Sequence, residues 1–241
     1  MVRLDGSCRF GEDSVERMIA YLVEFLEEDP FQQAPYVLDL GTGNGHLLFA
    51  LLEAREELSS GAVEPQRLCG VDYSPASIEL SRAIGAQREE GCEQVVFKEL
   101  DLRDQPSVAH LAQEANAGQG WDIVCDKGTV RRPPSDTARC RTPCANIQVA
   151  LSSQPVHGKL PVDLYVDAVA ALTRRSPPER PGIFFITSCN FTQEELEHKF
   201  LPAGFEVDHV VPSPTFMFVR VELTQGGQKG STVTTVAFRR T

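Results

Sequence analysis

The sequence lacks any apolar run long enough to cross a membrane. A spanning helix needs roughly 20 consecutive apolar residues, whereas this chain of 241 residues, 24% of them charged, interrupts every apolar stretch sooner. The opening stretch MVRLDGSCRFGEDS also lacks the continuous apolar core of a secretory signal. We therefore expect a cytoplasmic protein with no membrane partner.

A regular cysteine pattern is missing as well. The seven cysteines are an odd number and are scattered, mostly inside apolar runs, as is typical of reduced, buried thiols. Cys140 and Cys144 form the only close pair, and no second Cys or His pair at ligand spacing accompanies them. The sequence therefore predicts no metal site.

Positive charge is in short supply. The chain has 23 Lys and Arg residues against 34 Asp and Glu residues, which gives a formal net charge of -11. This balance argues against a nucleic-acid groove and mildly favours a partner with a basic surface, although many acidic proteins bind nothing basic.

Signs of nucleophilic catalysis are also absent. The five histidines form no triad pattern, and no Gly-x-Ser-x-Gly elbow accompanies them. Cys189 follows a strand candidate, but no base is placed near it in the sequence, so a lining role is favoured.

Short runs rich in Val, Ile, Leu and aromatic residues alternate with helical patterns. The runs 36–40, 67–72, 95–100, 121–126 and 182–188 resemble buried parallel strands, and helices are expected at 14–28, 46–57, 75–89, 106–117, 161–174 and 192–201. Capping boxes are predicted at the starts of the first and last of these helices, at Asp13 with Glu16 and at Thr192 with Glu195. The order predicts a mostly parallel α/β sheet with helices on both faces.

The remaining segments complete a single domain over 1–241. The candidate strands 205–211 and 232–239 predict an antiparallel hairpin at the sheet edge, and residues 10–28 form an N-terminal helix region. Residues 130–148 show no usable periodicity, which predicts an irregular insert.

The stretch YVLDLGTGNGHLLFALL, residues 36–52, predicts a ligand site. A strand ending at Asp39 is followed by Gly41, Gly43 and Gly45, and a helix begins at His46 with its positive end toward the turn. A nicotinamide enzyme usually has Gly-x-Gly-x-x-Gly, whereas this spacing with an acid beside it favours a ligand carrying an amino group, such as S-adenosylmethionine. Tight packing alone is the alternative.

Acidic residues at the ends of the next strands extend this site. Asp72 can accept both hydroxyls of a ribose, or it can simply cap the helix that begins near Pro75. Asp101 lies where an adenine edge would be read and Leu102 can pack against the ring, although a solvated turn is a close alternative. Tyr73, beside Asp72, is included among the cofactor-binding candidates.

Asp126 ends the fourth strand within DKGT and is the catalytic candidate. Its carboxylate can orient an incoming amine and favour the ammonium charge that develops there. Lysine in water has a pKa of about 10.4, so the site must help it lose its proton, and desolvation does this.

Five stretches together resemble the class I, seven-strand methyltransferases, and more narrowly the lysine methyltransferases that modify translation elongation factor 1-alpha. They are FGEDSVERMI (10–19), LDLGTGNG (38–45), GVDYSPASIELS (70–81), DKGT (126–129) and FITSCNFTQEEL (185–196).

The resemblance implies a Rossmann-like seven-strand sheet, mostly parallel with an antiparallel last strand. It also implies methyl transfer from S-adenosylmethionine to a lysine of that factor, in the cytoplasm. We expect the protein to be a monomer. Residue by residue, it assigns the methionine part to Asp39 and the three glycines, the ribose to Asp72, the adenine side to Asp101, and the place nearest the methyl to Asp126.

Two stretches depart from the family pattern. Val130, Arg131 and Arg132 stand where relatives have Phe-Asp-Ala, at the start of the insert 130–148, and residues 219–225 look interpolated. Both begin with Val and end with Gln, which suggests the hypothesis of translated intron sequence. The alternatives to an active lysine methyltransferase are a cofactor-binding scaffold with weakened catalysis and a small-molecule methyltransferase.

Overall fold

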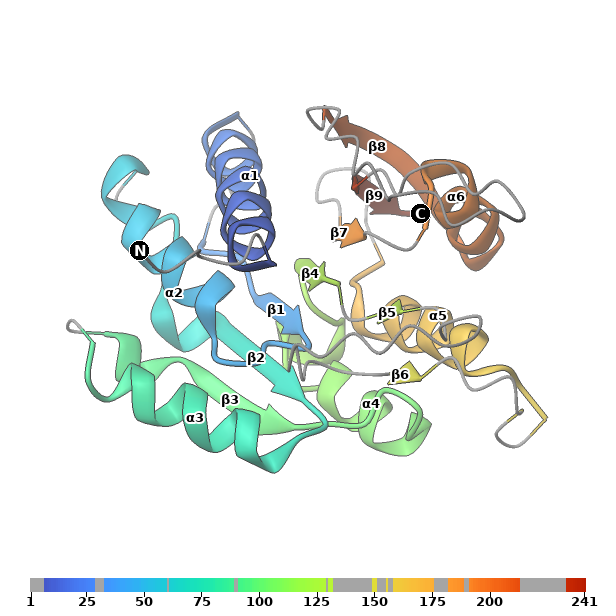
Figure 1. The fold of residues 1–241 in the computed structure, drawn as a ribbon, viewed down its shortest axis with the longest axis horizontal. Coiled ribbons are helices and arrows are strands. Elements are labelled where there is room, and N and C mark those ends of the chain that lie inside the picture. Colours follow the sequence, from blue (N-terminus) through green and yellow to red (C-terminus); the bar gives the residue numbers. More distant parts are fainter. Residues whose placement is uncertain are drawn as a thin grey trace, which may run out of the picture.

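A seven-stranded sheet with helices on both faces forms the centre of the molecule (Figure 1). The computed structural model describes residues 7–28, 33–59, 61–88, 91–128, 130–131, 149–150, 155, 158–175, 182–188, 191–212 and 233–241. The strands of the sheet are β1 Val37–Leu40, β2 Leu68–Asp72, β3 Val96–Glu99, β4 Ile123–Lys127, β7 Gly182–Ser188, β8 Phe205–Val211 and β9 Thr234–Arg240.

The strand order is β3-β2-β1-β4-β7-β9-β8. Strands β1 to β4 and β7 pair in parallel, whereas β9 runs antiparallel to both β7 and β8. The predicted fold, a mostly parallel seven-strand sheet with an antiparallel last strand, is confirmed. The predicted edge hairpin is also confirmed, with β9 inside the sheet and β8 at its edge.

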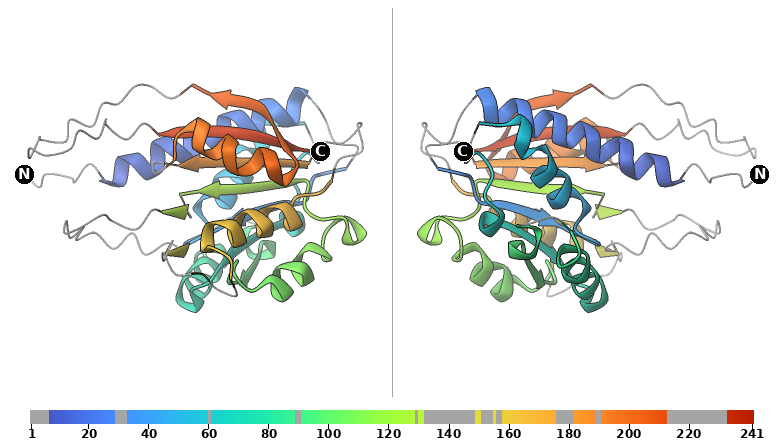
Figure 2. Two further views of the ribbon diagram at one scale, coloured as in Figure 1. Left: turned by 90° about the vertical axis from the view of Figure 1, so that its right-hand side faces the viewer. Right: turned by 90° about the vertical axis from the view of Figure 1, so that its left-hand side faces the viewer.

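The helices divide evenly between the two faces of the sheet. They are α1 Ser7–Glu28, α2 His46–Glu53, α3 Pro75–Gly85, α4 Gln105–Ala112, α5 Pro161–Leu172 and α6 Gln193–Phe200. Helices α4, α5 and α6 lie in front in the left view of Figure 2, and α1, α2 and α3 lie in front in the right view. Each face has its own buried apolar cluster, because strand side chains alternate between the faces.

Two helix starts test the capping predictions. Helix α6 begins after Thr192, whose hydroxyl accepts from the Glu195 amide at 3.2 Å while the Thr192 amide donates to the Glu195 carboxylate at 3.0 Å, so this capping box is confirmed. Helix α1 begins at Ser7, so the prediction of a helix start at Asp13 was wrong. Asp13 and Glu16 lie inside α1, where the backbone amides already take part in the hydrogen bonds of the helix, so there is no helix end for them to cap.

The expected insert is partly regular. Val130–Arg131 (β5) and Val149–Ala150 (β6) pair in parallel as a separate two-stranded ladder, where an irregular segment was expected to begin. Regular backbone pairing here was not visible in the periodicity, because two residues are too few to show it. Residues 132–148, 219–225, Thr129 and Cys189 lie outside the described residues.

The described ranges bear on the expected absence of a membrane span and of a metal site. No helix in them is long and apolar enough to cross a membrane, and they contain no group of three or more His, Cys, Asp or Glu residues that could hold a metal ion. Cys69, Cys92 and Cys125 are free and buried.

Candidate active site

The site lies where the strand order reverses. The chain moves from β1 outward to β2 and β3, then returns to β4 on the other side of β1. The connection after β1 leads to β2 on one side, and the connection after β3 leads to β4 on the other side of β1. This divergence opens a crevice at the carboxyl ends of the strands. The glycine turn after β1 lies at this edge.

Backbone hydrogen bonds hold the glycine turn on the end of β2. The amides of Gly41 and Thr42 donate to the Val71 carbonyl at 2.8 and 2.9 Å, and the Gly43 amide donates to Asp72 Oδ2 at 3.1 Å. Gly41, Gly43 and Gly45 have φ values of 69°, 57° and 79°, a region that favours glycine. The turn is therefore fixed in place rather than being a loose connection.

Gly45 also leaves no room for a side chain. A Cβ there would lie 2.7 Å from a ring carbon of Phe49 and 2.9 Å from one of Phe97. Gly45 precedes the first residue of α2, so the close packing sets where the helix starts relative to β3. The third glycine is thus required by packing, and the first two by the turn.

Asp39 is a buried acid beside the turn, with only 3% of its surface exposed. Burial raises the pKa of Asp39 to about 7, and the charges of Asp126 and Asp72 act in the same direction. Lys127 opposes them, as does the Thr42 hydroxyl, which lies near the carboxyl although its Oγ1 makes no well-formed hydrogen bond. A cationic ligand at this position would stabilise the ionised form of Asp39.

Asp72 ties the glycine turn to the start of α3. Its Oδ1 accepts from the Ser74 amide at 2.9 Å, while Oδ2 holds Gly43, and its side chain has no exposed surface. Burial raises the pKa of Asp72, and the backbone hydrogen bonds from Ser74 and Gly43 act against this rise. The N-cap of α3 is Ser74, whose hydroxyl accepts from the Ser77 amide at 3.4 Å. Asp72 is therefore not the N-cap of α3. Each of its carboxylate oxygens can still accept a hydrogen bond from a hydroxyl.

Strand register places the acids on two different faces. Asp39 lies opposite Gly70 and Asp72 follows Gly70 by two residues, so both acids point to the face covered by α1 to α3. Asp126 lies opposite Leu40, which packs in the cluster under α4 to α6. Asp126 therefore points to the other face of the sheet.

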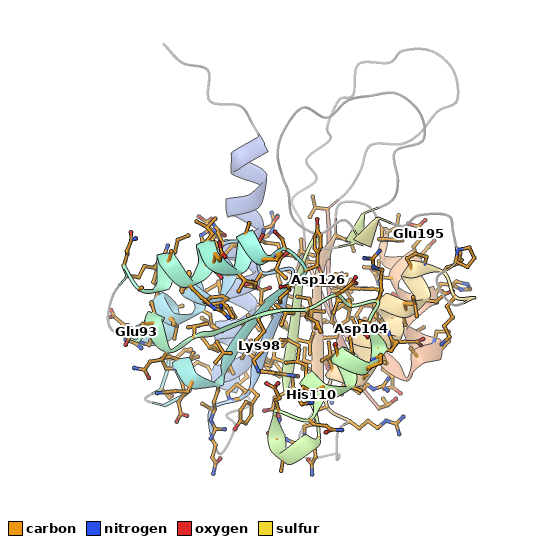
Figure 3. All side chains as sticks on the ribbon, turned by 90° about the horizontal axis from the view of Figure 1, so that it is seen from below. Glu93, Lys98, Asp104, His110, Asp126 and Glu195 are labelled. Atoms are coloured by element: carbon orange, nitrogen blue, oxygen red, sulfur yellow. The ribbon has the colours of Figure 1, made fainter. Side chains whose placement is uncertain are left out.

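Asp126 is buried against α5 and has no exposed surface. The Tyr165 hydroxyl donates to Asp126 Oδ2. Burial raises the pKa of Tyr165 well above its ordinary value, and the charge and hydrogen bond of Asp126 raise it further, so the phenol stays protonated as a donor. Figure 3 shows Asp126 among the central strands, toward the opposite end of the sheet from His110.

The remaining cofactor-binding candidates are spread around this centre. Arg103 donates to both oxygens of Asp101, with Nη2 at 2.6 Å from Oδ2, and this side-chain hydrogen bond holds the pKa of Asp101 below its ordinary value. Tyr73 is 44% exposed beside the crevice. Leu102 is buried in the α4 to α6 cluster, so its side chain is part of the core.

Comparison with known proteins identifies the family. A family model described as a methyltransferase domain matches residues 33–211. The chain is 35% identical over 239 residues to protein-lysine N-methyltransferase efm4 of Schizosaccharomyces pombe, covering 98% of this chain and 84% of that protein. The chain belongs to the Efm4 family of protein-lysine N-methyltransferases. Identity to the Saccharomyces cerevisiae member EFM4 is 30%, over 97% of this chain and 82% of that protein.

A further relative is similar over nearly the whole chain, and two solved structures share its fold. Human EEF1A lysine methyltransferase 2 is 29% identical, over 98% of this chain and 76% of that protein. Magnesium protoporphyrin IX methyltransferase from Synechocystis has a TM-score of 0.57 at 14% identity, covering 100% of this chain and 86% of that chain. A chain from the complex of the Haloferax volcanii Trm112 methyltransferase activator with a putative methyltransferase has a TM-score of 0.53 at 14% identity, over 98% of this chain and 94% of that chain. These structures show the shared fold.

Two members of the site in this Efm4-family chain were not predicted from the sequence. Thr42 stands between two glycines, and Tyr165 lies on the buried face of α5 with Leu164 and Val169. A tyrosine on an apolar helix face must find a partner for its hydroxyl, and that requirement is the available signal for Tyr165. Which acid would accept the bond could not be predicted, because the partner lies 39 residues away in sequence.

Proposed function

We propose that this chain transfers methyl groups from S-adenosylmethionine to a lysine ε-amino group of translation elongation factor 1-alpha, as a monomer in the cytoplasm. The proposal rests on similarity over 97 to 98% of the chain to proteins named as lysine methyltransferases, among them the human EEF1A lysine methyltransferase 2. The formal net charge of -11 also suits a basic protein substrate.

The glycine turn fits the methionine end of this cofactor. Gly41 and Gly43 put no side chain between the backbone and the crevice, and the Thr42 hydroxyl is buried without a hydrogen-bond partner. In the part of the chain that the structure describes, no salt bridge neutralises Asp39. When bound, S-adenosylmethionine supplies a methyl group on a positively charged sulfur, and a positive charge would favour the ionised form of Asp39.

Different residues of the chain bind different parts of S-adenosylmethionine. Asp39 holds the amino end through its charge, and Gly41 and Gly43 allow close approach of the backbone. Asp72 accepts ribose hydroxyls with its remaining lone pairs, while Asp101 lies toward the adenine.

The acceptor amine must arrive unprotonated and aligned. A lysine in water has a pKa of about 10.4, and transfer into a dry crevice lowers this pKa because burial disfavours the ammonium form. Asp126 lies near the end of β4, on the face covered by α4 to α6. From there it acts as a fixed negative charge that favours the ammonium group that develops during transfer.

A cofactor-binding scaffold with weak catalysis is the second candidate. The observation that favours it is the direction of the Asp126 side chain, which points to the face covered by α4 to α6 and away from Asp39 and Asp72.

Radiolabelled methyl transfer to purified elongation factor 1-alpha, with cofactor binding followed by calorimetry, separates the two candidates. An active methyltransferase labels one lysine-containing peptide, found by mass spectrometry, and Asp72→Ala reduces both binding and transfer. Asp163→Ala, which removes an exposed acid of α5, is the matched control and leaves both unchanged. Binding of S-adenosylmethionine without any transfer would favour the scaffold, and no binding at all would refute both candidates.

A further inference from the structure

A buried tyrosine and a buried carboxylate meet under the carboxyl edge of β4. Tyr165 has 2% of its surface exposed and Asp126 has none, and the Tyr165 hydroxyl donates to Asp126 Oδ2. Two polar side chains taken out of water in a mostly apolar layer carry a desolvation cost, and their mutual bond helps to offset it. The bond is therefore a fixed feature of this face.

The tyrosine ring is held independently of its hydroxyl. It packs edge-on against Phe200 with centroids 6.3 Å apart, and it lines a small apolar cavity with Ile186 and Phe191. Because a phenylalanine ring at this position could make the same contacts, the hydroxyl can be removed with little change in packing.

The charged and titratable groups around the pair come from three elements. They are Asp39 on β1, Cys125 and Lys127 on β4, and Lys199 on α6, which lines the same cavity as Tyr165. The charge of Asp126 raises the pKa of both Asp39 and Cys125, so its electric field extends through the strands to the opposite face. The carboxylate thus acts on the glycine-turn side although its atoms lie on the α5 side.

We propose that Tyr165 is a positioning residue for methyl transfer, which fixes the Asp126 carboxylate in place and in its ionised form beneath the reaction centre. This inference rests on the proposed function and extends it to the other face of the sheet. Tyr165 lies on the face of the sheet covered by α4 to α6, opposite the face of Asp39 and Asp72, and acts through Asp126. Loss of its hydroxyl removes one donor from a buried carboxylate, which shifts Asp126 toward the protonated form and weakens the fixed charge.

The test compares Tyr165→Phe, Asp126→Asn and the double variant by their kcat for transfer to elongation factor 1-alpha. A hydrogen bond to a charged group corresponds to about a 10- to 100-fold effect, so we expect Tyr165→Phe to lower kcat by that factor. In the Asp126→Asn background the same change should have little further effect, because the group through which it acts is gone. Calorimetric affinity for S-adenosylmethionine should stay within about twofold of wild type in Tyr165→Phe.

Tyr21→Phe is the matched control. Tyr21 is half-buried, whereas Tyr165 is buried, but it too hydrogen-bonds an aspartate, Asp208, and its pKa is raised first by burial and then by Asp208. This pair joins α1 to the edge strand β8. Loss of its hydroxyl should change stability by a similar amount and leave kcat unchanged.

A readout without substrate keeps this inference separate from the choice of substrate. Carbon-13 NMR of aspartate-labelled protein follows the Asp126 carboxyl, assigned as the resonance that Asp126→Asn removes. We expect its titration midpoint to rise by about one pH unit or more in Tyr165→Phe and to stay in place in Tyr21→Phe. Should Tyr165→Phe not fold, tyrosinate absorbance in Asp126→Asn gives the same coupling, with Tyr165 ionising at lower pH than in the native chain.

The outcomes separate the two proposals. A shifted Asp126 midpoint in a protein that methylates nothing in the elongation factor would overturn the proposed substrate and leave the pairing of Tyr165 with Asp126 supported. Equal kcat losses in the wild-type and Asp126→Asn backgrounds, or an unmoved midpoint, would overturn the role of Tyr165.

Discussion

Asp39→Asn should make the protein more stable at neutral and alkaline pH while weakening its cofactor site. The folded-state pKa of Asp39 is raised from 3.8 to about 7, chiefly by burial. Between these two values the folded chain binds more protons than the unfolded chain, so stability falls as the pH rises through this window. The difference of about three pH units corresponds to roughly 4 kcal/mol of destabilisation above pH 7.

The variant removes this pH dependence because asparagine cannot ionise. Urea unfolding at intervals from pH 4 to pH 8 should therefore show nearly equal stabilities at the acid end and a widening advantage for Asp39→Asn toward pH 8, approaching roughly 4 kcal/mol. Calorimetry at pH 8 should show weaker binding of S-adenosylmethionine to the variant, since the negative charge is missing.

Glu79→Gln serves as the control for removal of one negative charge, since Glu79 is exposed on α3. Its stability difference from wild type should stay within about 0.5 kcal/mol at every pH. A constant difference between Asp39→Asn and wild type across the range would show that burial does not hold the Asp39 carboxyl in its protonated form, and the argument for a cation at the glycine turn would lose its basis.

Three further substitutions test the framework around the site. Gly45→Ala should lower the free energy of unfolding by about 1 to 3 kcal/mol and reduce cofactor binding, because its Cβ would lie 2.7 Å from the Phe49 ring at a φ of 79°. Thermal unfolding and calorimetry measure the two effects, and an unchanged melting temperature would contradict the prediction. Thr192→Ala should cost about 1 kcal/mol, through loss of the α6 cap, with kcat unchanged in the transfer assay. Asp122→Ala should lower the free energy of unfolding, measured in urea, by about 3 to 5 kcal/mol, because it removes the carboxylate that lies 2.9 Å from the buried Arg174 guanidinium. A decrease below about 1 kcal/mol would show that the ion pair adds little to stability.

Local patterns were enough to predict the strands and the glycine turn. The run VLDL and its three following glycines specify a buried strand and a left-handed turn by residue type alone, and the alternation of strands with helices fixes a parallel order. These features depend on residues close together in sequence.

The orientation of the acids depends on residues far apart and was not predicted. Asp39 and Asp126 end adjacent strands in the same way, yet the register of β1 against β4 sends them to opposite faces of the sheet. The partner of Asp126 comes from a helix beyond the insert, and its identity follows from packing of α5 against the sheet. The start of α1 was missed because a helix can continue through residues that also favour caps.

The place of β9 between β7 and β8 imposes an order of events during synthesis. Residues 205–211 are synthesised before residues 234–240, yet they pair with the sheet only through them. Until the later segment arrives, the outer edge of β7 and both edges of the waiting strand have no backbone partner, and bare strand edges invite pairing with other chains. The nascent chain is thus most open to misassembly in the interval between these two segments, after its cofactor-binding half already has all of its strands.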